Sequence, residues 1–253
     1  NGISLIEVNP PYDVMRLINK KGLISQGRPL YGWTTSIFTV VARVATSFGI
    51  DLIMYGEDGE VEYGGDDKTK NIPYFESEYI KSVYLESNYQ ETFKGIKEDD
   101  LYFWMLDSDK LKDIKLTHWS YYEAWDSYRN YLIAKEHFGL EEVKSQNTGT
   151  YTNFAQNDTY LYDLHTFLMY IKFGFGRATQ DVGIDIRRGA MTREQGIQLA
   201  SMFDNQFPNE YLEMYLEYYE MKESEFIEIM HKHTNKDLFD CDKLEWHPKF
   251  KVI

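Results

Sequence analysis

Apolar side chains recur at helical spacing in the first fifty residues. Residues 12–20 place their apolar positions on one face of a predicted helix. The apolar stretch 34–48 predicts a second helix, with Thr34 or Thr35 as its N-cap and Gly49 at its C-terminal end. We expect this second helix to pack on a sheet.

Short apolar runs on either side of these helices predict strands. One is Ile3–Val8, and the other, Leu52–Tyr55, follows the second helix directly. This alternation is typical of a parallel sheet, whose strands are usually covered by helices on both faces. The predicted fold class is therefore α/β, with a partial parallel sheet in residues 1–115 and a mostly helical portion in residues 116–253. The weakly patterned residues 66–115 would form an excursion, a lid or a partner surface.

Helical periodicity dominates the second half of the chain. It is present in residues 118–138 and 160–173, and Thr192 with Gln195 fits a capping box for a further helix. The three apolar residues of Val182–Ile186 alternate with polar ones, which predicts a half-buried strand or an extended loop. Apart from that segment, the last third is predicted to be an all-helical cap.

Composition restricts the partners that the chain can have. Its 43% hydrophobic residues indicate a real core, and 27 Lys and Arg against 41 Asp and Glu give a net charge of −14. Such a charge argues against nucleic acid or an anionic membrane surface as the main partner. Cys241 is the single cysteine, so the chain forms no internal disulfide or multi-cysteine zinc site. A reducing, cytoplasmic compartment fits this cysteine usage, and no apolar run is long enough to cross a membrane.

One basic, glycine-containing segment stands out from the acidic background. Residues 172–193 hold five basic residues and two acids. Gly174 and Gly176 would let the backbone approach a ligand, and Arg177 could bind phosphate or carboxylate with two hydrogen bonds. We therefore predict that Lys172, Gly174, Gly176 and Arg177 line a basic pocket. The alternative is that the glycines end a helix and the arginines pair with acids.

These two interpretations of Arg177 predict opposite results for Arg177→Lys. A phosphate-binding arginine would lose ligand affinity on replacement, with little change in the melting temperature. An arginine that pairs with a buried carboxylate would instead lose stability.

A glycine-rich acidic turn is expected just after the strand Leu52–Tyr55. Gly56 follows that strand, and Glu57, Glu60 and Glu62 supply oxygen ligands that suit Mg²⁺ or orient a nucleophile. Ligands of open parallel sheets bind at this carboxyl edge. A solvated acidic loop is the alternative.

An aromatic group with a carboxylate lies within the helical segment predicted for residues 118–138. It consists of Tyr121, Tyr122, Trp125 and Asp126. Aromatic rings and a carboxylate suit a sugar, which presents an apolar ring face and hydroxyl donors. An aromatic helix-packing face is equally consistent with this pattern.

Four motifs in order carry a resemblance to a known family. They are YGEDGEVEYGG at 55–65, YYEAWDSY at 121–128, KFGFGRAT at 172–179 and IRRGAMTREQ at 186–195. Together they resemble the N-acetyl sugar amidotransferases of the PP-loop ATP-pyrophosphatase superfamily, which serve lipopolysaccharide O-antigen and nonulosonic acid pathways. The resemblance extends over nearly the whole chain, from about Ile6 to Asp242. The chain contains neither the Cys-rich segment nor the SGGKDS-type loop of that family, which leads us to expect a fragment of the enzyme.

The resemblance implies an ATP-dependent reaction and a set of site residues. ATP would activate an N-acetyl oxygen, and ammonia from a separate glutaminase subunit would convert the group to an acetamidino group. The implied fold is a nucleotide-binding portion like the PP-loop or adenine nucleotide alpha hydrolases in residues 1–115, followed by an acceptor-binding cap in residues 116–253. Glu57, with Mg²⁺, and Lys172 and Arg177 would be catalytic. The implied nucleotide or substrate contacts are Gly56, Glu62, Tyr63, Gly64, Gly65, Tyr122, Trp125, Asp126, Gly174, Gly176, Thr179 and Arg187.

The chain departs from the family pattern at three positions. The family tends to have a His and a Pro where this chain has Tyr121 and Ala124, and often an Asp where it has Gln180. Two other functions stay open: a non-catalytic module that binds sugar and glutaminase, and a tRNA-modifying relative, which the −14 charge disfavours. Since the phosphate loop is absent, we expect this chain alone to bind ATP weakly and to release no pyrophosphate.

Overall fold

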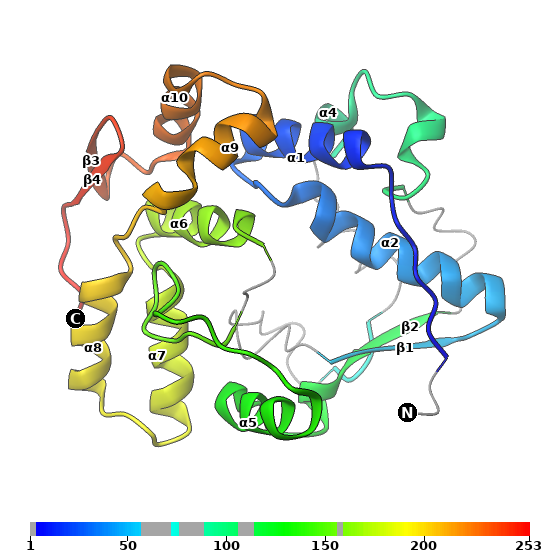
Figure 1. The fold of residues 1–253 in the computed structure, drawn as a ribbon, viewed down its shortest axis with the longest axis horizontal. Coiled ribbons are helices and arrows are strands. Elements are labelled where there is room, and N and C mark those ends of the chain that lie inside the picture. The colour runs from blue at the N-terminus through cyan, green and yellow to red at the C-terminus, as the bar shows by residue number, and fades with distance from the viewer. Residues whose placement is uncertain (1–3, 57–71, 76–88, 106–113, 156–158) are drawn as a thin grey trace.

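The computed structural model describes residues 4–56, 72–75, 89–105, 114–155 and 159–253 (Figure 1). The fold is mixed α/β and about 54% helical, with a small parallel sheet of two strands. The first part contains α1 (Tyr12–Gln26), α2 (Tyr31–Phe48), β1 (Leu52–Tyr55), α4 (Tyr89–Phe93), a 3₁₀ turn (Glu98–Leu101) and β2 (Lys115–His118). The second part contains a 3₁₀ turn (Trp119–Tyr121), α5 (Ser127–Phe138), α6 (Leu161–Phe173), α7 (Arg177–Arg187), α8 (Arg193–Phe203), a 3₁₀ turn (Asn209–Tyr211), α9 (Leu212–Tyr219), α10 (Glu223–His233), β3 (Phe239–Asp242) and β4 (Glu245–Pro248).

The parallel sheet consists of β1 and β2, with Leu52 opposite Lys115 and Tyr55 opposite His118. One face of the sheet packs on α2, where Ala42, Ala45, Ile53 and Leu116 belong to one buried cluster. The prediction of β1, and of a helix packed on it, is confirmed. The boundary expected at residue 115 falls on the first residue of β2.

The predicted strand Ile3–Val8 is wrong for the residues that the structure describes. Residues 4–8 form no strand, and Leu5 and Ile6 are 88% and 50% exposed. A strand needs a hydrogen-bonding neighbour, and the partner of β1 is β2, from much later in the chain. An apolar run alone could not reveal this.

The start of α2 also differs from the prediction, because its cap comes from another helix. The helix begins at Tyr31, and the side chain of Thr35 donates to the Tyr31 carbonyl at 2.7 Å instead of capping the helix. Asn19 of α1, which is 1% exposed, accepts hydrogen bonds from the backbone N–H groups of Gly32 at 2.7 Å and Trp33 at 3.4 Å. These bonds satisfy N–H groups that a helix start leaves without partners.

The largest core surrounds α6, between α7 on one side and α9 and α10 on the other (Figure 1). Leu164, Leu168 and Ile171 of α6 are fully buried or nearly so. Leu23 of α1 joins the same cluster, so a helix from the first part of the chain packs into the core of the second. Helix α1 also lies close to α2. Gly22 of α1 permits this, because a Cβ atom at Gly22 would lie only 2.3 Å from the Cβ atom of Tyr31.

The segment 182–186 is helical, so the prediction of a strand or extended loop is wrong. It lies inside α7, whose buried residues are Arg177, Ala178, Val182 and Ile184. Helix α8 packs directly beside it (Figure 1). The packing of α8 and the polar contacts of α7 stabilise a helix here, although the alternation of apolar and polar residues favours a strand. The predicted capping box of Thr192 and Gln195 at the start of α8 is confirmed.

The last third is not all-helical, because it contains an antiparallel hairpin of β3 and β4. Phe239 and Trp246 are buried, while Asp240 and Glu245 next to them are exposed, as expected for strands with one face on a core. The indole Nε1 of Trp246 donates to Thr234 Oγ1 at 2.9 Å and fixes the hairpin to the end of α10.

Candidate functional site: a cavity between α5 and α7

A cavity of about 700 Å³ lies between α5, the segment 140–155 and α7. Its volume is in the range of small-molecule sites. The lining has an aromatic wall that includes Trp125, Tyr128, Tyr131 and Phe154, and a wall of α7 that carries charged residues. The sequence KFGFGRAT ends α6 and begins α7, so it leads directly into this wall.

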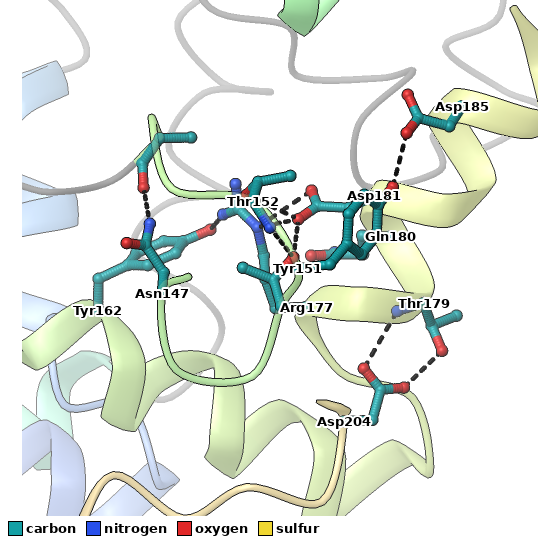
Figure 2. Close-up of polar contacts among 12 residues, drawn as sticks. Asn147, Tyr151, Thr152, Tyr162, Arg177, Thr179, Gln180, Asp181, Asp185 and Asp204 are labelled. Carbon is teal, nitrogen blue, oxygen red and sulfur yellow. Dashed lines mark hydrogen bonds and ion pairs between the residues drawn. The ribbon is translucent and has the colours of Figure 1, made fainter. Parts of the chain in front are cut away.

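Arg177, on the first turn of α7, is 6% exposed and contacts two other side chains. Its Nε donates to both carboxylate oxygens of Asp181, one turn later, at 3.2 Å. Its Nη1 donates to the hydroxyl of Tyr162, and its guanidinium lies 5.2 Å from the centroid of that ring. Figure 2 shows Arg177 between these two partners. Arg177 is therefore a partner of a buried carboxylate, as the alternative interpretation predicted.

Asp181 also holds the segment 140–155 against α7. Its Oδ2 accepts a hydrogen bond from Thr150 Oγ1 at 2.5 Å and a longer one from Thr152 Oγ1 at 3.5 Å. The segment is itself folded back, since Asn147 N donates to the Thr152 carbonyl at 2.8 Å. One carboxylate thus connects the arginine to the loop that closes the cavity (Figure 2).

Asp185 forms the second polar group of this wall. It accepts hydrogen bonds from Tyr151 Oη and from Arg188 Nε, both at 2.7 Å. Burial, together with the bond to Asp185, raises the pKa of Tyr151, so this phenol stays a neutral donor. Arg188 also lines the cavity, and its guanidinium lies 5.4 Å from the ring centroid of Tyr128.

Asp204 caps the N-terminus of α7 from the end of α8. The side chain is 5% exposed and accepts hydrogen bonds from Gly176 N at 3.0 Å, Thr179 N at 3.1 Å and Thr179 Oγ1 at 2.5 Å (Figure 2). Burial raises the pKa of this carboxyl, although the hydrogen bonds oppose the rise. Gly176 is required here, because a Cβ atom would lie 2.9 Å from the Asp204 carboxylate.

Two titratable side chains of α6 have strongly shifted pKa values. Burial, with the nearby charge of Glu210, raises the pKa of Asp163 to about 7, although Arg177 opposes the shift. Burial, with the charges of Arg28 and Lys172, lowers the pKa of His165 to about 4. Near neutral pH, His165 is therefore uncharged and Asp163 is partly protonated.

Asp163 is expected to make stability depend on pH. Its folded-state pKa of about 7 lies above its ordinary value of 3.8, so between these pH values the folded chain binds a proton that the unfolded chain has released. Stability should then fall as the pH rises from about 4 to 7 and stay low above that. Asp163→Asn should raise the melting temperature at pH 8 but not at pH 4, as measured by thermal unfolding. Asp242→Asn, at an exposed position, is the control; a fall in melting temperature of Asp163→Asn at pH 8 would contradict the assignment.

The structure does not bring the four residues of the predicted basic pocket together. Lys172 Nζ donates to the carbonyls of Gln26 at 2.7 Å and Gly27 at 2.8 Å, at the end of α1. Gly174 ends α6 in a left-handed conformation, and Gly176 contacts Asp204. Among the predicted pocket residues only Arg177 lines the cavity. The shared anion pocket, and the catalytic roles of Lys172 and Arg177, stay predictions.

The other predicted contacts of this region are dispersed. Trp125 lines the cavity, whereas Tyr122 is exposed near β2, where Thr117 Oγ1 donates to its hydroxyl at 3.4 Å. Asp126 caps α5 by accepting from Arg129 N at 3.0 Å. Arg187 is exposed at the end of α7.

Of the predicted acidic turn, only Gly56 lies within the described residues. Gly56 follows β1 and is exposed. Glu57, Glu60 and Glu62, together with Tyr63, Gly64 and Gly65, lie outside the described residues. Within the described ranges, no group of three or more His, Cys, Asp or Glu residues could hold a metal ion. The Mg²⁺ site at Glu57 therefore stays a prediction.

Sequence reasoning missed four polar residues of this region: Tyr151, Asp181, Asp185 and Asp204. A signal for two of them was present. The pairs Arg177–Asp181 and Asp185–Arg188 have helical i, i+4 and i, i+3 spacing, but the segment was interpreted as extended. Nothing in the local sequence links Tyr151 or Asp204 to α7.

The helices of the described ranges include none with the length and apolar character needed to cross a bilayer. A search of curated proteins found no match. Residues 148–251 match the family described as LPS biosynthesis protein WbpG-like, C-terminal domain. The matched segment includes α6, α7, α8 and the polar wall of the cavity. This similarity supports a role in lipopolysaccharide biosynthesis.

Proposed function

We propose that this chain belongs to an ATP-dependent amidotransferase that converts an N-acetyl group of a bacterial surface-polysaccharide sugar to an acetamidino group. The observation that carries the proposal is the match of residues 148–251 to a lipopolysaccharide biosynthesis domain. The matched segment contains the motifs KFGFGRAT and IRRG, which resemble those of N-acetyl sugar amidotransferases. In this proposal the cavity between α5 and α7 belongs to the acceptor-binding portion.

The proposed reaction has two steps. The acetyl oxygen attacks the α-phosphate of ATP, and pyrophosphate leaves. Ammonia, supplied by a glutaminase subunit, then attacks the activated carbon, and AMP leaves with the former acetyl oxygen. The carbon–oxygen bond is thereby replaced by a carbon–nitrogen bond, and the product is amidine, AMP and pyrophosphate. The activated intermediate must be shielded from water, which would hydrolyse it back to the acetyl group.

The fixed side chains of the cavity support its proposed role as the acceptor site. The contacts of Asp181 with Arg177 and Thr150 fix the closing loop, and Asp185 fixes Tyr151. Side chains held in this way keep a bound ring in one orientation, which is the main contribution of a binding site to a two-substrate reaction. ATP would supply the activation, with Glu57 and Mg²⁺ in the roles that the resemblance implies.

Product analysis tests this function. The natural full-length protein would be incubated with ATP, Mg²⁺, ammonium chloride and a nucleotide-linked N-acetyl sugar. We expect a sugar product lighter by the difference between an oxygen atom and an NH group, with one AMP and one pyrophosphate for each product. Formation of ADP and orthophosphate with an unchanged acetyl group would contradict the proposal. The present chain, assayed in parallel, should bind ATP weakly and release no pyrophosphate, because it contains no SGGKDS-type loop.

A further inference from the structure

The charged groups that line the cavity are mutually paired. Arg177 pairs with Asp181, and Arg188 with Asp185. Glu142, the remaining acid of the lining, pairs with Lys135 at 2.5 Å. Each of the three carboxylates therefore has a cationic partner, and both arginines of the lining are already held in ion pairs. To gain a cationic partner at this wall, a phosphate would have to break one of these ion pairs.

The rest of the lining suits the apolar face of a ring. Tyr131 stacks on Phe154 with ring centroids 4.4 Å apart and an angle of 23° between the planes. Tyr128 contacts both rings at 5.6 and 6.1 Å. This aromatic surface offers π faces to the C–H groups of a sugar, while the carboxylate of Asp185 in the same lining has lone pairs for hydroxyl donors.

Two polar groups of the aromatic wall have unused hydrogen-bonding capacity. The indole Nε1 of Trp125 is buried and has no acceptor within the described part of the chain. A buried donor without a partner costs about 1–3 kcal/mol, so an acceptor from a ligand would be favourable there. The Asn130 side chain lines the same cavity and makes no side-chain hydrogen bond to the residues that the structure describes.

We propose that this cavity binds an uncharged sugar ring with its N-acetyl group, not a phosphate. The ring packs on the wall of Tyr128 and Phe154. Trp125 Nε1 donates to an oxygen of the sugar, and the Asn130 amide bonds a hydroxyl or the acetamido group. The proposed function supplies the N-acetyl identity of the sugar, while the preference for an uncharged ring follows from the cavity itself.

Ligand-detected NMR with N-acetylglucosamine as the probe tests this inference on the natural full-length protein. Saturation transfer to the probe is expected, and Trp125→Phe and Asn130→Ala should each weaken its binding about three- to tenfold, the effect of one lost hydrogen bond. Trp119→Phe is the matched control, because Trp119 is exposed and lies outside the cavity lining; it should bind like the wild type. Asn130→Ala changes a partly exposed side chain, so it serves even if Trp125→Phe fails to fold.

Three results would overturn the inference: no saturation transfer, unchanged binding in both variants, or displacement of the sugar by pyrophosphate. These failures are distinct from failure of the proposed function. Sugar binding that depends on Trp125 and Asn130 without amidine formation would reject the reaction alone. Amidine formation with binding that is insensitive to both variants would reject the cavity alone.

Discussion

Replacing Arg177 by methionine is expected to lower the free energy of unfolding by about 3–5 kcal/mol, because it leaves a buried charge without its partner. The carboxylate of Asp181 is 11% exposed and would keep only its threonine donors. The Tyr162 hydroxyl would lose a partner as well. Urea unfolding followed by circular dichroism measures the change. Adding Asp181→Leu should recover part of the loss, since replacing both charges removes the unpaired one.

Arg193→Met is the matched control for this prediction. Arg193 is exposed and makes one hydrogen bond, to the Ile253 carbonyl at 2.9 Å, so its replacement should change stability by less than about 0.5 kcal/mol. Arg177→Lys should also lower stability, because a lysine cannot reproduce the forked contacts with Asp181 and Tyr162. An unchanged unfolding midpoint in Arg177→Met, together with lost phosphate binding, would show that Arg177 serves an anion site instead.

Replacing Asp204 by alanine is expected to cost about 2–4 kcal/mol, because it removes a charge-assisted cap from a buried helix start. The backbone N–H groups of Gly176 and Thr179 would lose their acceptor in a place that water does not reach easily. The same bonds connect the end of α8 to the start of α7, so α7 should lose order first. Hydrogen exchange at the amides of α7, together with urea unfolding, measures both effects.

Asp126→Ala provides the comparison for Asp204→Ala. Asp126 caps α5 through a single bond from Arg129 N, is 28% exposed and makes one long ion pair with Arg188 at 3.8 Å, so its loss should cost about 0.5–2 kcal/mol. If Asp204→Ala lowers the free energy of unfolding no more than Asp126→Ala does, Asp204 stabilises the protein no more than a local helix cap, which would contradict this prediction.

Elements whose signals are local were predictable from the sequence. The capping box of Thr192 and Gln195 at α8 and the periodicity of α6 needed only neighbouring residues. The start of α2 was not predictable, because its cap is the side chain of Asn19 on another helix. The hairpin of β3 and β4 was missed because its strands, FDCD and EWHP, mix apolar with polar residues and lack an apolar run like the LIMY of β1.

The candidate site was predictable only in part, because several of its contacts join segments that are distant in the sequence. The sequence identified the segment around Arg177 and the residue Trp125, which both line the cavity. It predicted an anion partner for Arg177, because charge was counted along the chain and the facing carboxylate of Asp181 was not placed on the same helix face. The contribution of Tyr151 arises from a loop that tertiary packing alone brings to α7.

The path of the acetyl oxygen tests the proposed amidotransferase reaction most directly. The full-length protein would be given ATP, ammonia and a nucleotide-linked sugar whose acetyl oxygen carries a heavy-isotope label, and AMP would be examined by mass spectrometry. Activation of that oxygen by ATP predicts that the label appears in the phosphate of AMP in step with amidine formation. Label that stays in the sugar, or that appears in orthophosphate, would contradict the account.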